Sequence, residues 1–172
     1  YISQDPMSAL TPALTIGQQM MDVLYREPWS RKEKWARAVD ALDWVSLPDP
    51  AARMKMYPYQ LSGGQRQRVS IAMALILEPD LVIADEPTTA LDATLEVEIL
   101  DLLRRLQHET GSAVIFVTHH LGVVSSLCDD VLVMHRGDIV EAGPVSEVFT
   151  RPAHDYTRRL LRCDPARIAQ TT

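Results

Sequence analysis

Apolar residues recur at helical spacing in several stretches of this 172-residue chain, and each such stretch predicts a helix with one buried face. The helices are expected over 15–25, over 30–46, from 65 up to Pro79, and over 93–109. Shorter apolar runs predict strands over 81–86 and 113–118. Strand, helix and strand in this order form a βαβ unit with parallel strands and a right-handed crossover.

Local signals mark where these helices begin and end. Ser30, with Glu33 three residues later, is a capping box that predicts a helix start. Gly111 directly follows the helix over 93–109, as glycine commonly does. The prolines of Pro48-Asp49-Pro50 predict the end of the second helix.

Two helices have an apolar stripe that we expect to be buried. In the helix that begins at Gln65, the stripe is made by Val69, Ala72, Met73 and Ile76. In the helix over 93–109, it is made by Leu95, Ile99, Leu102, Leu103 and Leu106. The pattern predicts that Arg66, Gln67 and Ser70 point outward from the first of these helices.

The last third of the chain predicts smaller elements. A short helix near 121–127 precedes strands over 131–135 and 138–142, which Arg136-Gly137 joins as a hairpin. A helix near 144–150 comes before a basic tail that starts at residue 151. The residues alone leave open that this tail is an exposed basic helix without a partner.

Composition favours a folded globular domain and excludes several classes of protein. Hydrophobic residues make up 47% and the net charge is −6, which argues against a general nucleic-acid binder. No apolar run approaches the roughly 20 residues of a membrane-spanning helix, and the first residues carry no secretory signal. Two cysteines, Cys128 and Cys163, cannot build a disulfide framework, so we expect reduced thiols in the cytoplasm.

A glycine-rich turn opens the helix at Gln65. Its residues are Leu61-Ser62-Gly63-Gly64-Gln65. A helix N-terminus exposes unpaired N–H groups and carries a partial positive charge, and glycine lets an anionic oxygen approach the backbone. The turn therefore predicts a phosphate-binding site, although the four residues from Ser62 to Gln65 taken alone also suit an ordinary helix start.

Polar residues follow both predicted parallel strands. Asp85 and Glu86 end the run Leu81-Val82-Ile83-Ala84, which we expect to be a buried strand, and two adjacent carboxylates suit a metal ion and a water. His119 follows the strand over 113–118, which places it at the same sheet edge. Loop solvation or helix capping remains the alternative for the carboxylates, and an ordinary hydrogen bond remains the alternative for His119.

These segments together resemble the motifs of ATP-binding cassette (ABC) ATPases. The glycine turn with Arg66-Gln67-Arg68 is similar to the signature motif, and Asp85 to Asp92 resembles Walker B and the D-loop. Thr118-His119 looks like the H-loop, and Gln4-Asp5-Pro6 like the Q-loop. The resemblance implies ATP and Mg²⁺ as cofactors, and it covers essentially the whole chain.

The resemblance also implies a role for each motif residue. Ser62, Gly63, Gly64 and Gln65 would press on the γ-phosphate held by a partner cassette. Asp85 and Gln4 would hold Mg²⁺. Glu86 would act as general base and His119 would contact the γ-phosphate. Asp92 would communicate across the dimer, and it can equally cap the following helix.

Further segments resemble the peptide and nickel importer branch. They are Gln4 to Met7 with Leu10-Thr11-Pro12, Tyr57 to Gln60, Gly137 to Glu141, and the tail from His154 to Leu161. The branch implies an ATPase subunit at the cytoplasmic face of a bacterial membrane. Its partners would be a second ATPase subunit, identical or homologous, transmembrane permease subunits and, indirectly, a solute-binding protein, with no nucleic acid.

One expected motif is missing, since no G-x-x-x-x-G-K-[ST] phosphate loop occurs in the chain. We therefore expect a P-loop NTPase-like α/β cassette core with an α-helical signature subdomain, without the N-terminal strands and Walker A. The expected division is a Q-loop segment at 1–12, the helical subdomain at 13–79, the core at 80–150 and an importer-type extension at 151–172. Alone, the chain is expected to be inactive, and the alternative is a non-catalytic docking module.

Overall fold

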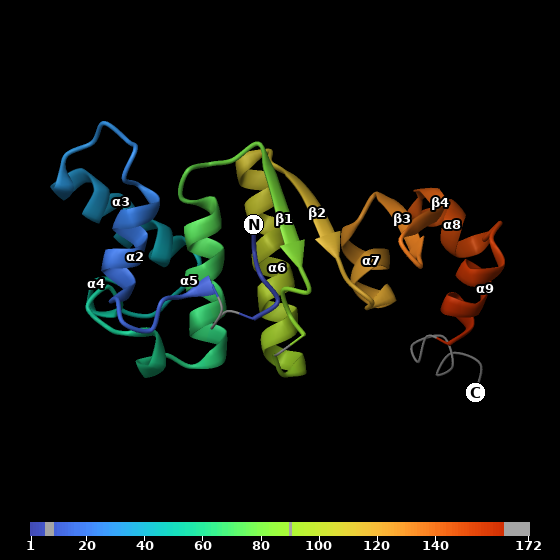
Figure 1. Ribbon diagram of the computed structural model, residues 1–172, viewed down its shortest axis with the longest axis horizontal. Helices are drawn as coiled ribbons and strands as arrows, with labels where there is room; N and C mark the ends of the chain where they lie inside the picture. The colour runs from blue at the N-terminus through green and yellow to red at the C-terminus, as the bar shows by residue number, and fades with distance from the viewer. Residues whose placement is uncertain (6–8, 90, 164–172) are drawn as a thin grey trace. The chain divides into compact units, whose positions relative to one another are not determined.

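The computed structural model describes residues 1–5, 9–89 and 91–163 (Figure 1). The chain divides into two compact units, Tyr1–Val117 and Thr118–Thr172. Part of the expected Q-loop segment, part of the C-terminal extension and the side chain of Leu106 lie outside the described residues. Within the described ranges, no helix is both long enough and apolar enough to cross a bilayer.

The first unit is mainly helical. Its helices are α2 (Ile16–Val23), α3 (Arg31–Trp44), α4 (Pro50–Arg53), the 3₁₀ turn η1 (Pro58–Gln60), α5 (Gly63–Leu75) and α6 (Ala93–Thr110). Ser30 caps α3 and forms the expected capping box with Glu33, because each side chain accepts a hydrogen bond from the other residue's N–H. The helix ends before Pro48, however, and Pro50 instead starts α4, where a proline needs no intrahelical N–H bond.

The sheet of this unit confirms the expected βαβ unit. Strand β1 (Leu81–Asp85) pairs in parallel with β2 (Ala113–Val117), and α6 connects them. Gly111 ends α6 in the left-handed conformation, with φ of 68°. One further residue joins the sheet, because Ile2 forms a parallel bridge with Ala84. Its N–H donates to the Ile83 carbonyl at 2.8 Å.

Only one face of these two strands is covered. Val82 and Ala84 are buried, whereas Leu81 and Ile83 are 49% and 37% exposed, because neighbouring side chains of a strand point to opposite faces. Ile115 and Val117 of β2 are exposed as well. The expectation of a strand buried on both faces is therefore wrong for β1 among the described residues.

Helix α5 corrects the predicted orientation of two polar side chains. Gln67 is 1% exposed and Ser70 is 5% exposed, although the pattern placed both outward. The reason is that α5 is covered on more than one side. It packs against α3, and Gln67 reaches the segment that follows β1. A helix covered in this way buries polar positions that an amphipathic pattern assigns to solvent.

The second unit is built around a hairpin. Its elements are α7 (Leu121–Leu127), β3 (Asp130–His135), β4 (Asp138–Pro144), α8 (Val145–Thr150) and α9 (Asp155–Arg162). Strands β3 and β4 are antiparallel, as expected. Arg136 and Gly137 both have positive φ, 53° and 93°, which matches the twist of a tight hairpin. Cys128 and Cys163 are both free thiols.

The basic tail is docked within this unit. The Glu141 carboxylate on β4 accepts hydrogen bonds from the N–H groups of Ala153, at 2.7 Å, and His154, at 3.0 Å. The rings of His135 and Tyr156 stack with their centroids 4.0 Å apart. Thr157 and Leu161 are buried. Helix α9 therefore packs one face against its own unit, while Arg158, Arg159 and Arg162 stay exposed.

Replacing Glu141 with alanine is expected to loosen α9 from the hairpin, because two N–H groups lose their acceptor. Trypsin should then cleave faster after Arg158, Arg159 and Arg162, as mass spectrometry of timed digests can measure. Glu147→Ala, at an exposed position of α8, is the matched control. Equal cleavage rates in the two variants would contradict this role of Glu141.

The same contact should depend on pH. The buried Thr157 hydroxyl lies beside the Glu141 carboxylate, though outside full hydrogen-bond geometry. Together with the N–H groups of Ala153 and His154 it lowers the pKa of Glu141 below its ordinary value of 4.5. A lowered pKa means that the contact is fully stabilising above pH 4.5 and is lost as the pH falls below that value.

Candidate functional site

The glycine turn lies at the start of α5, and it is accessible at Ser62 and in part at Gly63, whereas Gly64 is buried. Ser62 is exposed and caps the helix. Its hydroxyl accepts from the Gln65 N–H at 3.3 Å, and the Gln65 side chain accepts from the Ser62 N–H at 3.1 Å. The Ser62 carbonyl takes the Arg66 N–H. Among the described residues, the N–H groups of Gly63 and Gly64 have no hydrogen-bond partner. The first N–H groups of a helix have no acceptor within the helix and can bind an anion.

The two glycines differ in their surroundings. A Cβ on Gly63 would meet open space, whereas a Cβ on Gly64 would lie 3.1 Å from Leu95 Cδ1. Gly63 therefore leaves room for an incoming oxygen. Gly64 lets the start of α5 pack against the start of α6. The sequence analysis assigned both glycines to phosphate access and missed this packing role.

The two carboxylates lie where β1 ends. Asp85 is the last residue of the strand, and its Oδ2 accepts a hydrogen bond from the Tyr1 hydroxyl at 2.7 Å. This bond raises the pKa of the Tyr1 phenol, because the carboxylate stabilises its proton. Sequence reasoning missed Tyr1. Tyr1 is brought to Asp85 by the bridge between Ile2 and Ala84, and no local sequence pattern predicts this bridge.

Glu86 leaves the strand in a left-handed conformation. Its φ is 47°, which is uncommon for a residue with a Cβ and marks a position held by its surroundings. Its N–H donates to the Val117 carbonyl at 2.8 Å, and its carboxylate accepts from the Thr89 hydroxyl. The Glu86 N–H therefore still bonds to β2, while the left-handed backbone of Glu86 ends the strand after Asp85.

Gln4 lies at the same edge of the sheet. Ile2 pairs in parallel with Ala84, and Gln4 and Glu86 each come two residues after the bridged position. Gln4 is exposed. The pairing places the segment that carries Gln4 next to the end of β1, although Gln4 and Asp85 are more than 80 positions apart in the sequence.

Asp92 is shown to cap α6. Its Oδ1 accepts from the N–H groups of Thr94, at 3.1 Å, and Leu95, at 3.0 Å. The side chain is exposed, so the cap leaves it accessible to a partner. The capping role is confirmed, and the role across a dimer stays a prediction.

His119 is the second residue of the second unit. It is exposed, and its ring meets that of His120 edge to face with centroids 4.5 Å apart. It follows β2 by two residues. Its place beside the carboxylates of the first unit stays a prediction.

The oxygen donors of the predicted metal-binding residues suit a Mg²⁺ ion that binds together with a nucleotide. No group of three or more His, Cys, Asp or Glu side chains that could enclose a metal occurs among the described residues. Mg²⁺, however, commonly takes one or two carboxylates and completes its shell with waters and phosphate oxygens. Asp85, with hard oxygen donors at an accessible sheet edge, fits that requirement.

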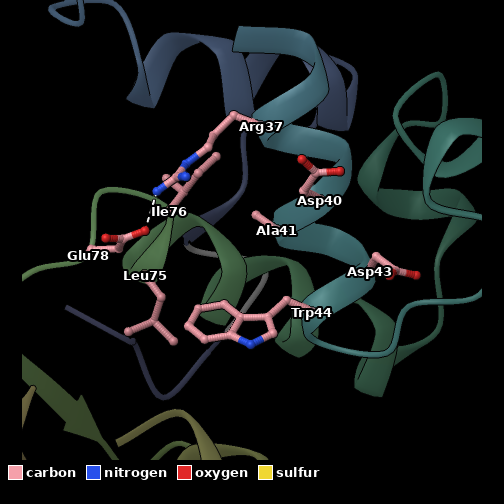
Figure 2. Close-up of a pocket in the computed structure, with 8 residues that line it drawn as sticks. All are labelled: Arg37, Asp40, Ala41, Asp43, Trp44, Leu75, Ile76 and Glu78. Atoms are coloured by element: carbon pink, nitrogen blue, oxygen red, sulfur yellow. Dashed lines mark hydrogen bonds and ion pairs between the residues drawn. The ribbon is translucent and has the colours of Figure 1, made fainter. Parts of the chain in front are cut away.

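An open pocket lies elsewhere, between α3 and the end of α5, with a volume of about 430 Å³ (Figure 2). Arg37 reaches across it to form an ion pair with Glu78, and Trp44 closes the opposite side. None of the residues predicted to bind phosphate, metal or water lines this pocket, although Ile76 of the predicted apolar stripe does. It therefore has no part in the predicted chemistry.

Comparisons with known proteins show the family and the fold that this chain is similar to. The family model described as ABC transporter matches residues 1–89. The probable D,D-dipeptide transport ATP-binding protein DdpD of Escherichia coli K12 is 49% identical over 95% of this chain and 50% of its own length. The oligopeptide transport ATP-binding protein OppD of Salmonella typhimurium is 48% identical over 95% of this chain and 49% of its own. The chain thus spans about half the length of these curated relatives.

Two solved structures share the fold. One is the dimeric post-hydrolysis state of the ATP-binding cassette MJ0796 bound to ADP and Pi, with a TM-score of 0.71, 31% identity, and coverage of 84% of this chain and 61% of that one. The other is cbiO1 from Clostridium perfringens, with a TM-score of 0.75, 30% identity, and coverage of 99% and 65%. The expected cassette fold is confirmed as a partial cassette with parallel and antiparallel strand pairs. The chain therefore belongs to the ABC transporter family, and within that family it is similar to peptide-transport ATP-binding proteins.

Proposed function

We propose that the chain is part of the ATP-hydrolysing subunit of a bacterial importer of peptides or related small solutes. The observation that carries this proposal is the turn at the start of α5, where Ser62 is exposed and the N–H groups of Gly63 and Gly64 have no partner among the described residues, on a unit that also carries Asp85 and Glu86 at its sheet edge. One surface suits a phosphate and the other suits a metal ion and a water.

The predicted residues act at two different ATP sites: the glycine turn acts on the nucleotide of a second cassette, and the other residues act on the nucleotide of their own cassette. The turn from Ser62 to Gln65 binds the γ-phosphate of a nucleotide held by a second cassette, with its N–H groups and helix dipole directed at the negative charge. Glu86 takes a proton from the attacking water, and His119 orients the γ-phosphate. Asp85 and Gln4 would hold Mg²⁺, which would neutralise phosphate charge when bound.

The proposed partners follow from the same division. A turn that works on another cassette's nucleotide requires a dimer, and MJ0796 has been solved as a dimer with ADP and Pi. The exposed Asp92 would lie at this dimer contact. The cbiO1 cassette is part of a transporter complex. Permease subunits in a bacterial membrane and an external solute-binding protein complete the proposed assembly, with the chain at the cytoplasmic face.

The chain by itself is expected to hydrolyse ATP negligibly, because it contains no G-x-x-x-x-G-K-[ST] loop. One preorganised donor to a transition-state anion is worth about 3 kcal/mol, and the missing loop would supply several donors. Steady-state ATPase assays should show turnover only after the upstream half of a relative is added. Calorimetric binding of ATP to the chain alone with micromolar affinity would contradict this and reveal another phosphate site.

A docking module without catalysis is the second candidate. The exposed apolar face of β1 and β2, made by Leu81, Ile83, Ile115 and Val117, favours it, because such a face suits a partner protein. In that case, the upstream half would bind the chain without any gain in ATPase. Recovery of ATPase on mixing would instead show a split enzyme and contradict the docking role.

A further inference from the structure

Gln67 is a buried polar residue that the proposed chemistry does not use. It lies one helical turn after Gly63 and is 1% exposed. Its Nε2 donates a hydrogen bond to the Pro87 carbonyl at 2.7 Å, across 20 positions of sequence. Burying an amide costs free energy unless the amide is hydrogen-bonded. The Gln67 side chain therefore needs the Pro87 carbonyl as its acceptor.

The acceptor belongs to the turn that presents Glu86. Within this turn, the Glu86 carbonyl accepts from the Thr89 N–H at 3.3 Å, and the Thr88 carbonyl accepts from the Leu91 N–H at 3.0 Å. The Pro87 carbonyl between them takes its donor from Gln67. The left-handed backbone of Glu86 is joined directly to Pro87 and persists only if the surroundings hold it.

Two neighbouring contacts tie the same parts together. Gly64 at the start of α5 packs against Leu95 at the start of α6. The buried Thr88 donates its hydroxyl hydrogen bond to Glu96 at 3.1 Å. The glycine turn, the Glu86 turn and the start of α6 are therefore linked in one cluster by side chains.

We propose that Gln67 is a positioning residue that holds the Pro87 carbonyl and so fixes the backbone that presents Glu86, coupling the glycine turn to the carboxylates within one chain. The proposal rests on the proposed function for the role of Glu86. It assigns Gln67 no contact with ATP or with the attacking water. Its consequence is that a shift of α5 upon phosphate binding reaches Glu86 through one side-chain hydrogen bond.

The first test replaces Gln67 with methionine, which keeps the side-chain length but removes the donor. Backbone amide shifts of isotope-labelled protein are expected to change at Glu86, Thr88 and Thr89. Ser70→Ala, at the other buried polar position of α5, is the control and should leave these shifts in place. Unchanged shifts at Glu86 and Thr88 in Gln67→Met would overturn the proposal.

The second test uses Gln67→Glu to switch the bond with pH. A protonated carboxyl can donate to the Pro87 carbonyl, whereas a carboxylate cannot, and burial raises the pKa of such a carboxyl. The Glu86–Thr89 shifts should match wild type at low pH and resemble Gln67→Met at high pH. Wild type measured at each pH is the reference that removes pH-dependent shift changes that do not come from position 67. A difference from wild type that stays constant with pH would overturn the proposal.

A third measurement needs no variant. The bond in wild type should give a scalar coupling between Gln67 Nε2 and the Pro87 carbonyl carbon, and its absence would overturn the proposal even if both variants failed to fold. None of these measurements depends on ATP hydrolysis. If the scalar coupling and the shift changes are observed while the reassembled cassette hydrolyses no ATP, the positioning role of Gln67 stands and only the proposed function fails.

Discussion

Glu86→Gln is expected to lower ATP hydrolysis by about 10²- to 10⁴-fold in the chain reassembled with the upstream half of a relative. The amide has the shape of the carboxylate but cannot take a proton from water. The KM for ATP should change little, because Glu86 is assigned no contact with the bound nucleotide. Phosphate release at saturating ATP measures the effect.

Glu98→Gln makes the same chemical change on α6, where Glu98 pairs with Arg68 at the surface, and should retain full activity. Equal turnover in Glu86→Gln and wild type would contradict a catalytic role for Glu86.

The left-handed backbone of Glu86 gives a separate prediction on stability, because a left-handed residue with a Cβ costs roughly 1–2 kcal/mol. Glu86→Gly should therefore unfold at a higher temperature than Glu86→Ala, despite losing the same carboxylate.

Ile99→Ala is expected to destabilise the first unit by about 2–5 kcal/mol. Ile99 on α6 is fully buried in the same core as Val82 and Ala84 of β1. Its truncation removes apolar contacts and leaves a cavity between helix and sheet. Whole domains are stable by only about 5–15 kcal/mol, so the loss should appear clearly as a lower urea midpoint.

Val97→Ala provides the matched control on the same helix. Val97 is 58% exposed, and alanine has the higher helix propensity, so its free energy of unfolding should change by no more than about 0.5 kcal/mol. Similar losses in both variants would mean that α6 does not bury the face seen in the structure.

The predicted positions of helices and strands were correct wherever the signal is local. Ser30 with Glu33 and Asp92 with the N–H groups of Thr94 and Leu95 are caps that span two or three residues. Such interactions are encoded by neighbouring residues and need no knowledge of the fold. The hairpin at Arg136-Gly137 was predictable for the same reason.

The errors arose where a helix or strand meets distant parts of the chain. Gln67 and Ser70 were assigned to solvent because an amphipathic pattern assumes one covered face, whereas α5 is covered on more than one side. Conversely, Leu81 and Ile83 were expected to be buried, and they are exposed. Hydrophobic residues favour burial, but the packing of neighbouring helices and strands determines which faces are covered.

The candidate site divides in the same way. The sequence alone determined the glycine turn, the adjacent carboxylates and the family to which they belong, because these are short runs of residues with a defined chemistry. Only the tertiary structure paired the segment of Ile2 with β1, attached Tyr1 to Asp85 and joined Gln67 to Pro87. These contacts connect residues 20 to 84 positions apart, and their partners are selected by the pairing of strands and the packing of helices, which no local spacing specifies.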